Sequence, residues 1–292
     1  MSTINEKSTA PLGTATVPNY EVSQAVKPRN WVNNVAWVVL ILIAISAVIN
    51  IFTNPRWNWD VVFTYVLDPQ VMAGLGRTIL LTFAAGAAGL AGGLIVGLMN
   101  MSRSSALRVI ALSYIGFIRA IPALVLILVL YFLSALFPVV SLGLPLMNPI
   151  VAVPTNTFLS QFGAAMLGLS MIVAGHTAEI IRGGIMSVSK GQTEAARALS
   201  IPRAQAFTRI ILPQAIRVTI PSFATELITL FKNTSLVSVI GYAELLTVVQ
   251  NIYGRTYETL PLLTVACLWY LLLTILAMIG QSRLEQRFGR GF

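Results

Sequence analysis

Residues 191–213 read GQTEAARALSIPRAQAFTRIILP, a charged segment with two prolines in an otherwise apolar chain. Apolar runs long enough to cross a bilayer lie on both sides of it. From Gly191 to Ala198 the residues are good helix formers. Ser200 is expected to cap a second helix that carries Pro202 in its first turn. The stretch is therefore predicted to form two short helices joined by a tight corner.

The second helix is expected to run to about Leu212, where Pro213 interrupts it. One interpretation of the segment is an amphipathic connector on the lipid headgroups, which its arginines would suit. Helices that lie on lipid headgroups bury large apolar side chains in the lipid. Here the residues that follow Glu194 include three small ones, Ala195, Ala196 and Ala198. This composition favours a helix that enters a groove on another protein.

The composition of the whole chain is that of a membrane protein. Of its 292 residues 56% are hydrophobic and only 10% are charged, whereas soluble domains carry about 25% charged residues. The formal net charge is +9, but the positive residues fall between apolar runs, which indicates membrane topology rather than nucleic-acid binding. The single cysteine and single histidine exclude an internal disulfide and make a metal cluster improbable on sequence grounds.

The predicted fold is an all-α membrane protein with six transmembrane helices, at about 34–53, 78–101, 117–137, 162–182, 219–241 and 259–281. Lys and Arg concentrate before the first, after the second, after the fourth and after the sixth of these spans. The positive-inside rule therefore predicts that both termini and residues 191–213 face the cytoplasm. Residues 1–29 are expected to be a disordered cytoplasmic tail, and the uncharged loop 138–161 a compact extracytoplasmic cap.

The second predicted span is rich in glycine. Small residues at helical spacing let helices approach closely in lipid, although a flexible gate is the alternative interpretation. The glycines concerned are Gly86, Gly89, Gly92, Gly93 and Gly97.

Ionisable residues inside predicted spans are rare and suggest a function unless they pair with one another. Lys232 lies about twelve residues into the fifth predicted span, near mid-bilayer, and its partner could be Glu226, Glu179 or a substrate carboxylate. Glu179 and Arg182 have the i, i+3 spacing of an intrahelical ion pair, which would explain both without a function.

His176 lies one turn before Glu179 and is expected to be a buried, hydrogen-bonded side chain or a substrate contact. Arg119 precedes Pro122 at the start of the third predicted span. It is expected to be either a snorkelling anchor or a gate residue that pairs across helices. Pro122 is expected to kink that helix. Thr234 and Ser235 could bond to their own helix.

The spacing EAA-x3-G-x9-I-x-L-P is matched here by Glu194, Ala195, Ala196, Ser200, Ile210, Leu212 and Pro213. This pattern resembles the cytoplasmic signature of permease subunits of bacterial ABC importers. Ser200 stands where that family usually has glycine, the residue that adopts a left-handed corner at least cost.

Further residues resemble the branch of permeases for polar amino acids. Residues 178–185 read AEIIRGGI, against A-E-I-x-R-G-x-I in that branch, and lead into GQTEAA. Residues 232–236 read KNTSL, against K-D-T-S-L, and residues 119–122 read RAIP, against R-G-T-P. The resemblance covers about 75–285 and leaves 30–56 as an extra N-terminal transmembrane helix beside a five-helix core.

The resemblance implies a type I importer permease, a multi-pass protein of the bacterial cytoplasmic membrane that contacts lipids and binds no nucleic acid. It would pair with a second permease, the same or a homologous chain, and receive substrate from an extracytoplasmic amino acid-binding protein. ATP and Mg would be bound by separate ATP-binding cassette subunits, since the chain contains no GxxxxGK[ST] motif. The chain itself would hold no cofactor, metal or catalytic residue.

Two sets of residues follow from this interpretation. The cytoplasmic segment 186–213 would couple to the ATPase through Gly191, Glu194, Ala195, Ala196, Ser200, Ile210, Leu212 and Pro213. The candidates for the substrate pathway are Arg119, His176, Glu179, Glu226, Lys232, Thr234 and Ser235.

Two rival functions remain at the level of the sequence. An ion-coupled secondary transporter would explain buried charges, but it usually shows internal repeats, and none is evident between 34–137 and 162–281. A membrane enzyme would need a nucleophile or a set of metal ligands, which one histidine and one cysteine do not supply.

Overall fold

The computed structural model describes residues 31–142 and 151–288. The chain divides into two units, Met1–Asn54 and Pro55–Phe292. In the first unit, α1 is the uncharged 23-residue helix Trp31–Thr53. At about 1.5 Å per residue it is long enough to cross a hydrocarbon core of about 30 Å. The predicted tail 1–29 lies outside the described residues.

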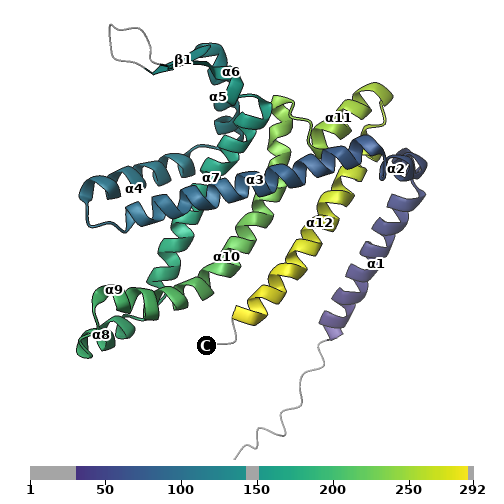
Figure 1. Cartoon of the computed structure of the whole chain (residues 1–292). Helices are drawn as coiled ribbons and strands as arrows, with labels where there is room; N and C mark the ends of the chain where they lie inside the picture. The colour runs from purple at the N-terminus through teal and green to yellow at the C-terminus, as the bar shows by residue number, and fades with distance from the viewer. Residues whose placement is uncertain (1–30, 143–150, 289–292) are drawn as a thin grey trace, which may run out of the picture. The chain divides into compact units, whose positions relative to one another are not determined.

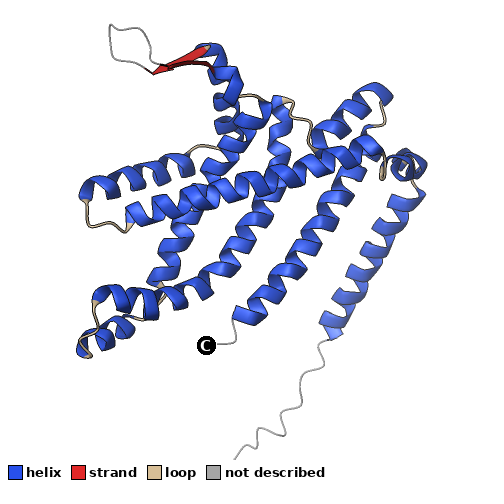
Figure 2. Ribbon diagram, viewed as in Figure 1, coloured by secondary structure: helices blue, strands red, loops and turns tan. Residues whose placement is uncertain are grey.

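The second unit is a set of helices with one small hairpin (Figures 1 and 2). The helices are α2 Trp59–Tyr65, α3 Pro69–Asn100, α4 Ser105–Ala120, α5 Ala123–Leu136, α6 Thr155–Phe158, α7 Gln161–Met186, α8 Lys190–Ala198, α9 Arg203–Ala206, α10 Leu212–Asn233, α11 Leu245–Thr256 and α12 Thr259–Phe288. Shorter helical turns are the 3-10 segments Pro55–Trp57 and Thr234–Ile240 and the π-helical segment Phe207–Ile211.

The hairpin lies in the loop predicted to be a compact cap. Strands β1 Val139–Leu142 and β2 Val151–Pro154 run antiparallel, with Val139 opposite Pro154 and Leu142 opposite Val151. The sequence analysis predicted a compact cap here but no strands. Residues 143–150 between the strands lie outside the described residues.

The predicted all-α membrane architecture is confirmed. Within residues 31–142 and 151–288, five helical segments are long and apolar enough to cross a membrane, or six if α4 and α5 count as one bent span. The kink predicted at Pro122 is confirmed, since α4 and α5 meet at an angle of 104°, but the bend separates two helices where one kinked helix was expected at 117–137. Pro122 disfavours the helical conformation of the residue before it, and Ile121 is extended with φ −94° and ψ 131°.

Two other spans begin earlier than the sequence suggested. Helix α3 begins at Pro69, where the Asp68 side chain accepts a hydrogen bond of 2.8 Å from the Gln70 backbone N–H. Helix α10 begins at Leu212 and is followed by the 3-10 turn Thr234–Ile240. Lys232 therefore lies in the last turn of α10, just before this 3-10 turn. Its predicted depth near mid-bilayer stays a prediction.

The glycines of α3 allow close packing against α7, as predicted. A Cβ atom on Gly89 would lie 2.5 Å from Cβ of Val173, and one on Gly93 would lie 2.3 Å from Cβ of Thr177. Such distances are below any real Cβ contact, so only glycine permits this approach of the two helices. Helix α7 also contacts α4, α5 and α10, which makes it the centre of the unit.

The described parts of the second unit have two recognisable ends (Figure 1). Helices α8 and α9 lie at the same end as the C-terminal end of α12, whereas α11 and the hairpin lie at the opposite end. The loops after the fourth and sixth predicted spans thus share one end, as the distribution of Lys and Arg requires. Which end faces the cytoplasm stays a prediction.

Candidate functional site

Charged side chains from three helices gather around α7. His176, Glu179 and Arg182 are spaced three residues apart along α7 and therefore share one face of the helix. Arg119 reaches this face from the last turn of α4, beside the bend between α4 and α5. Glu226 reaches it from α10. We call these five residues the charged cluster.

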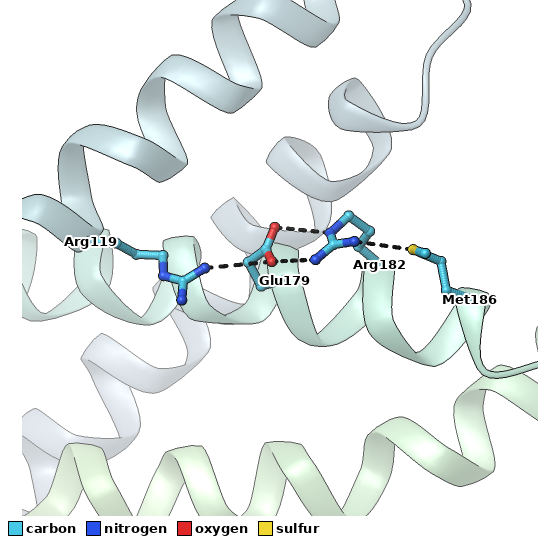
Figure 3. Close-up of polar contacts among 4 residues, drawn as sticks. All are labelled: Arg119, Glu179, Arg182 and Met186. Carbon is cyan, nitrogen blue, oxygen red and sulfur yellow. Dashed lines mark hydrogen bonds and ion pairs between the residues drawn. The ribbon is translucent and has the colours of Figure 1, made fainter.

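Glu179 binds two arginines at once (Figure 3). Nε and Nη2 of Arg182 donate to Oε1 and Oε2 of Glu179 at 3.1 and 2.7 Å, which is a bidentate ion pair. Nη1 of Arg119 lies 3.6 Å from Oε2 of the same carboxylate. Arg182 additionally contacts Sδ of Met186 at 3.1 Å. The predicted intrahelical pair is confirmed, and Arg119 also pairs across helices.

Glu226 has a different partner. Its Oε1 lies 2.9 Å from Nδ1 of His176, so the imidazole donates to the carboxylate when that nitrogen carries its proton. The Glu226 side chain is only 13% exposed and His176 is 39% exposed. The predicted hydrogen bond of His176 is confirmed, and this half-buried pair joins α7 to α10.

Small residues on α7 bring the three helices close enough for these contacts. A Cβ on Gly175 would lie 3.0 Å from Cγ2 of Ile118, the neighbour of Arg119 in α4. The Tyr114 hydroxyl donates to the Met171 carbonyl at 2.8 Å, which ties α4 to α7 a second time. Towards the other end of α7, a Cβ on Gly184 would lie 2.1 Å from Cγ2 of Thr219 in α10.

The arrangement offers both signs of charge to a ligand. The cluster holds two guanidinium groups and two carboxylates, so it carries no net charge when His176 is neutral. Both arginines pair with Glu179. Within the described residues, Glu226 has only the imidazole of His176 as an ion-pair partner. A ligand with a carboxylate and an ammonium group could meet an arginine with one and Glu226 with the other.

The other three pathway candidates lie apart from the charged cluster. Within the described residues Lys232 makes no ion pair, so neither Glu226 nor Glu179 is its partner. It lines a pocket of about 280 Å³ together with Ser235, Cys267 and Tyr270. The hydroxyl of Ser235 donates to the Lys232 carbonyl at 2.8 Å, and that of Thr234 to the Phe231 carbonyl at 2.6 Å. Both hydroxyls thus bond to their own helix.

One buried acid, Glu244, escaped the sequence analysis. It is fully buried at the N-terminus of α11, where it accepts from the backbone N–H groups of Leu246 and Thr247 at 2.8 and 2.7 Å. The Tyr270 hydroxyl of α12 also donates to it at 2.9 Å. Burial raises the pKa of the Glu244 carboxyl, and these hydrogen bonds oppose the rise. Glutamate is not a preferred capping residue, so its position before an apolar run gave little signal.

The corner between α8 and α9 has the geometry that glycine normally supplies. Ser200 is left-handed with φ 55°. Its N–H donates to the Arg197 carbonyl, and the N–H of Ile201 donates to the Ala196 carbonyl, both at 2.9 Å. These two bonds form a Schellman motif that ends α8. The expectation that Ser200 caps the next helix is wrong, because α9 begins at Arg203 after Pro202 and its N-terminus has no side-chain cap.

The connection from α9 to α10 is helical throughout, so the predicted interruption at Pro213 is also wrong. The π-helical segment Phe207–Ile211 leads directly into α10, and the Leu212 N–H donates to the Phe207 carbonyl. Pro213 is the second residue of α10 and directly follows the π-helical turn, so the helix continues past a proline that would disturb a regular α-helix. The side-chain amide of Gln214 donates to the Ile210 carbonyl at 2.8 Å and satisfies an acceptor at this change of helical register.

The coupling candidates divide into exposed and packed residues. Gly191, Glu194 and Ala195 are exposed on α8, whereas Ala196 is buried where α8 contacts α9. Leu199, next to the corner, is 74% exposed although it is a large apolar residue. The pair α8–α9 therefore presents an acid, small residues and one apolar side chain at one end of the molecule.

Residues 89–290 match the family of the "Binding-protein-dependent transport system inner membrane component". The chain belongs to this family. It is 32% identical over 298 residues to the arginine transport system permease protein ArgU of Corynebacterium glutamicum, covering 100% of this chain and 89% of that protein. It is 34% identical to the probable amino-acid ABC transporter permease protein YckA of Bacillus subtilis, over 79% of this chain and 96% of that protein.

A solved structure of similar sequence has the same fold. The structure of an amino acid ABC transporter with histidines aligns with a TM-score of 0.65 and 34% identity, over 75% of this chain and 94% of that one. The permease is thus a multi-pass membrane protein of the amino acid ABC transporter class, and the resemblance seen in the sequence is confirmed.

Proposed function

We propose that this permease is the membrane-spanning subunit of an ATP-driven importer of polar amino acids or close relatives in the bacterial cytoplasmic membrane. Its domain would be 75–285, with 30–56 as an added N-terminal span. The observation that carries the proposal is the exposed pair α8–α9, with the EAA spacing, in a chain that lacks a phosphate-binding GxxxxGK[ST] motif. Such a subunit needs a separate ATPase to supply energy.

Coupling would pass through segment 186–213. Glu194 and Ala195 are exposed and available to a groove on an ATP-binding cassette subunit, which would hold ATP and Mg. Ile210, Leu212 and Pro213 belong to the helical connection into α10. Movement of α8–α9 would reach Glu226 through α10 and so alternate the exposure of the charged cluster between the two sides of the membrane.

The charged cluster would recognise the substrate. An α-amino acid carries a carboxylate and an ammonium group, which match Arg119 or Arg182 on one side and Glu226 on the other. The names of the relatives agree with this class, because they include permeases for arginine, nopaline, glutamine and L-cystine. A second permease and an extracytoplasmic amino acid-binding protein would complete the importer.

The test is reconstitution of the permease with its co-purifying ATPase in proteoliposomes. Uptake of labelled amino acids should require ATP and the binding protein, and ATPase activity should rise when the binding protein carries its amino acid. Uptake that persists without ATP and stops when the proton gradient is removed would instead identify an ion-coupled secondary transporter.

A further inference from the structure

A pocket of about 400 Å³ lies between the N-terminal part of α3 and α11. Its polar lining consists of Gln70 and Arg77 from α3 and Asn251 and Arg255 from α11, and none of its lining residues is acidic. Two cations thus meet at one pocket from two helices that are distant in sequence.

Both arginines retain most of their donors. Nη1 of Arg77 donates to the Ala243 carbonyl at 3.1 Å, and Nε of Arg255 donates to the Asn251 carbonyl at 3.1 Å. Neither forms an ion pair within the residues that the structure describes. A guanidinium has five N–H donors in a fork that fits carboxylates, so both side chains remain suited to an added acidic group.

The acids near this pocket in the sequence already have local partners. Asp68 accepts from the Gln70 backbone N–H at 2.8 Å and caps α3. Glu258 accepts from Nδ2 of Asn58 at 3.1 Å. Neither acid forms an ion pair with Arg77 or Arg255, so both guanidinium groups have no acidic partner among the residues that the structure describes.

An exposed aromatic residue follows the arginine pair. Tyr257, two residues after Arg255, is 88% exposed and has a left-handed backbone with φ 61°. This conformation is unfavourable for a residue with a Cβ, and it ends α11. Tyrosine and arginine are, together with tryptophan, enriched at the energetic centres of protein interfaces.

We infer that Arg77, Arg255 and Tyr257 form a docking surface for acidic side chains of the extracytoplasmic binding protein. The inference rests on the proposed function, because it takes the end opposite α8–α9, where α11 lies, as the outer one (Figure 1). Gln70 and Asn251 add both donors and acceptors, which suit the mixed polar groups of a protein better than a purely anionic lipid headgroup.

The experiment measures stimulation of ATPase activity in proteoliposomes by the binding protein that activates the wild-type complex. For each complex, stimulation is expressed relative to its own basal rate. The double variant Arg77→Glu/Arg255→Glu should raise the concentration of binding protein that gives half-maximal stimulation about tenfold or more. Tyr257→Ala should also raise this half-maximal concentration, although it changes no charge. Added salt should raise the half-maximal concentration more for the wild type than for the charge-reversed variant.

Arg108→Glu is the matched control. Arg108 is exposed and donates a single bond of 3.2 Å to a backbone carbonyl, that of Ser102, but it lies in α4 away from the arginine pair. Its reversal should leave the half-maximal concentration unchanged.

Unchanged half-maximal concentrations in both the double variant and Tyr257→Ala would overturn the inference while leaving the proposed function intact. A shift that is seen in vesicles with anionic lipids and disappears in vesicles of zwitterionic phosphatidylcholine, which has no net charge, would assign the arginines to anionic lipid headgroups and would also overturn the inference. Absence of stimulation of the wild-type complex by every amino acid-binding protein would instead contradict the proposed function itself.

Discussion

Nδ1 of His176 lies 2.9 Å from Oε1 of Glu226, and this contact joins α7 to α10 beside the ion pairs of Glu179. Helix α10 is also the helix into which the segment 186–213 continues. A change at Glu226 therefore acts on the charged cluster and on the helix that would carry the coupling movement.

Glu226→Gln should weaken recognition of the substrate ammonium group. The amide keeps the size of the side chain but removes its charge, and hydrogen bonds to charged groups contribute about 1.5–3 kcal/mol. The KM for uptake should rise about tenfold or more. The control is Glu285→Gln on α12, where Glu285 accepts a hydrogen bond from the Gln281 side chain. Equal KM values for both variants would exclude Glu226 from the pathway.

Glu194→Lys should separate ATP hydrolysis from transport. The side chain is exposed on α8, so the substitution should not disturb folding or membrane insertion. Reversal of its charge at a protein interface would oppose docking on the ATPase. The measurement is the ratio of amino acid imported to ATP hydrolysed in proteoliposomes, with Glu194→Gln as the milder variant. Normal uptake by the lysine variant would disprove the docking role.

Ser200→Gly should stabilise the corner after α8. A left-handed φ of 55° costs serine about 1 kcal/mol more than glycine. Hydrogen exchange of the Ser200 and Ile201 amides, which form the Schellman bonds, should slow in the glycine variant. Ser200→Val should have the opposite effect, because a β-branched residue tolerates this backbone less well. Faster exchange with glycine would contradict this account of the corner.

Gly93→Ala should destabilise the packing of α3 on α7. The added Cβ would lie 2.3 Å from Cβ of Thr177, and overpacking of a core costs about 1–3 kcal/mol. Gly76→Ala on the same helix is the control, because nothing lies within 4 Å of its added Cβ. It should stabilise α3 by about 0.5–1 kcal/mol. The check is the apparent Tm in detergent, and equal values for both variants would contradict the packing role.

Glu244→Ala should loosen the junction of α11 and α12. The substitution leaves the N–H groups of Leu246 and Thr247 and the Tyr270 hydroxyl without their acceptor. Buried donors without partners cost about 1–3 kcal/mol each when water cannot replace the acceptor. The expected result is a lower apparent Tm in detergent, with Glu258→Ala as a half-buried control. A Tm equal to that of the wild type would show that water replaces the carboxylate.

The sequence predicted the helices of the membrane core because long apolar runs have few alternatives in lipid. Its errors lie where the backbone rather than composition decides. The bend at Ile121 depends on the conformation that Pro122 imposes, and it is sharper than the kink within one helix that the sequence predicted. The start of α10 was placed too late because Arg217 interrupts the apolar run.

The charged cluster was predictable only in part. Glu179 and Arg182 are adjacent on one helix, so their spacing predicted their contact. The contacts of Glu179 with Arg119 and of His176 with Glu226 join different helices, and no local pattern encodes such distances. Composition suggested that Lys232 needs an acidic partner, but its place at the C-terminal end of α10 offers it the negative end of the helix dipole.

The π-helical segment Phe207–Ile211 lets the connection between α8–α9 and α10 hold an extra residue. A π-helical turn is equivalent to one residue inserted into an α-helix, and it takes up that residue in one wide turn. The helices on either side therefore keep nearly the phase that an unbroken α-helix would give them. In the proposed importer, a movement of α8–α9 would reach α10 through a helix that absorbs one additional residue without a break.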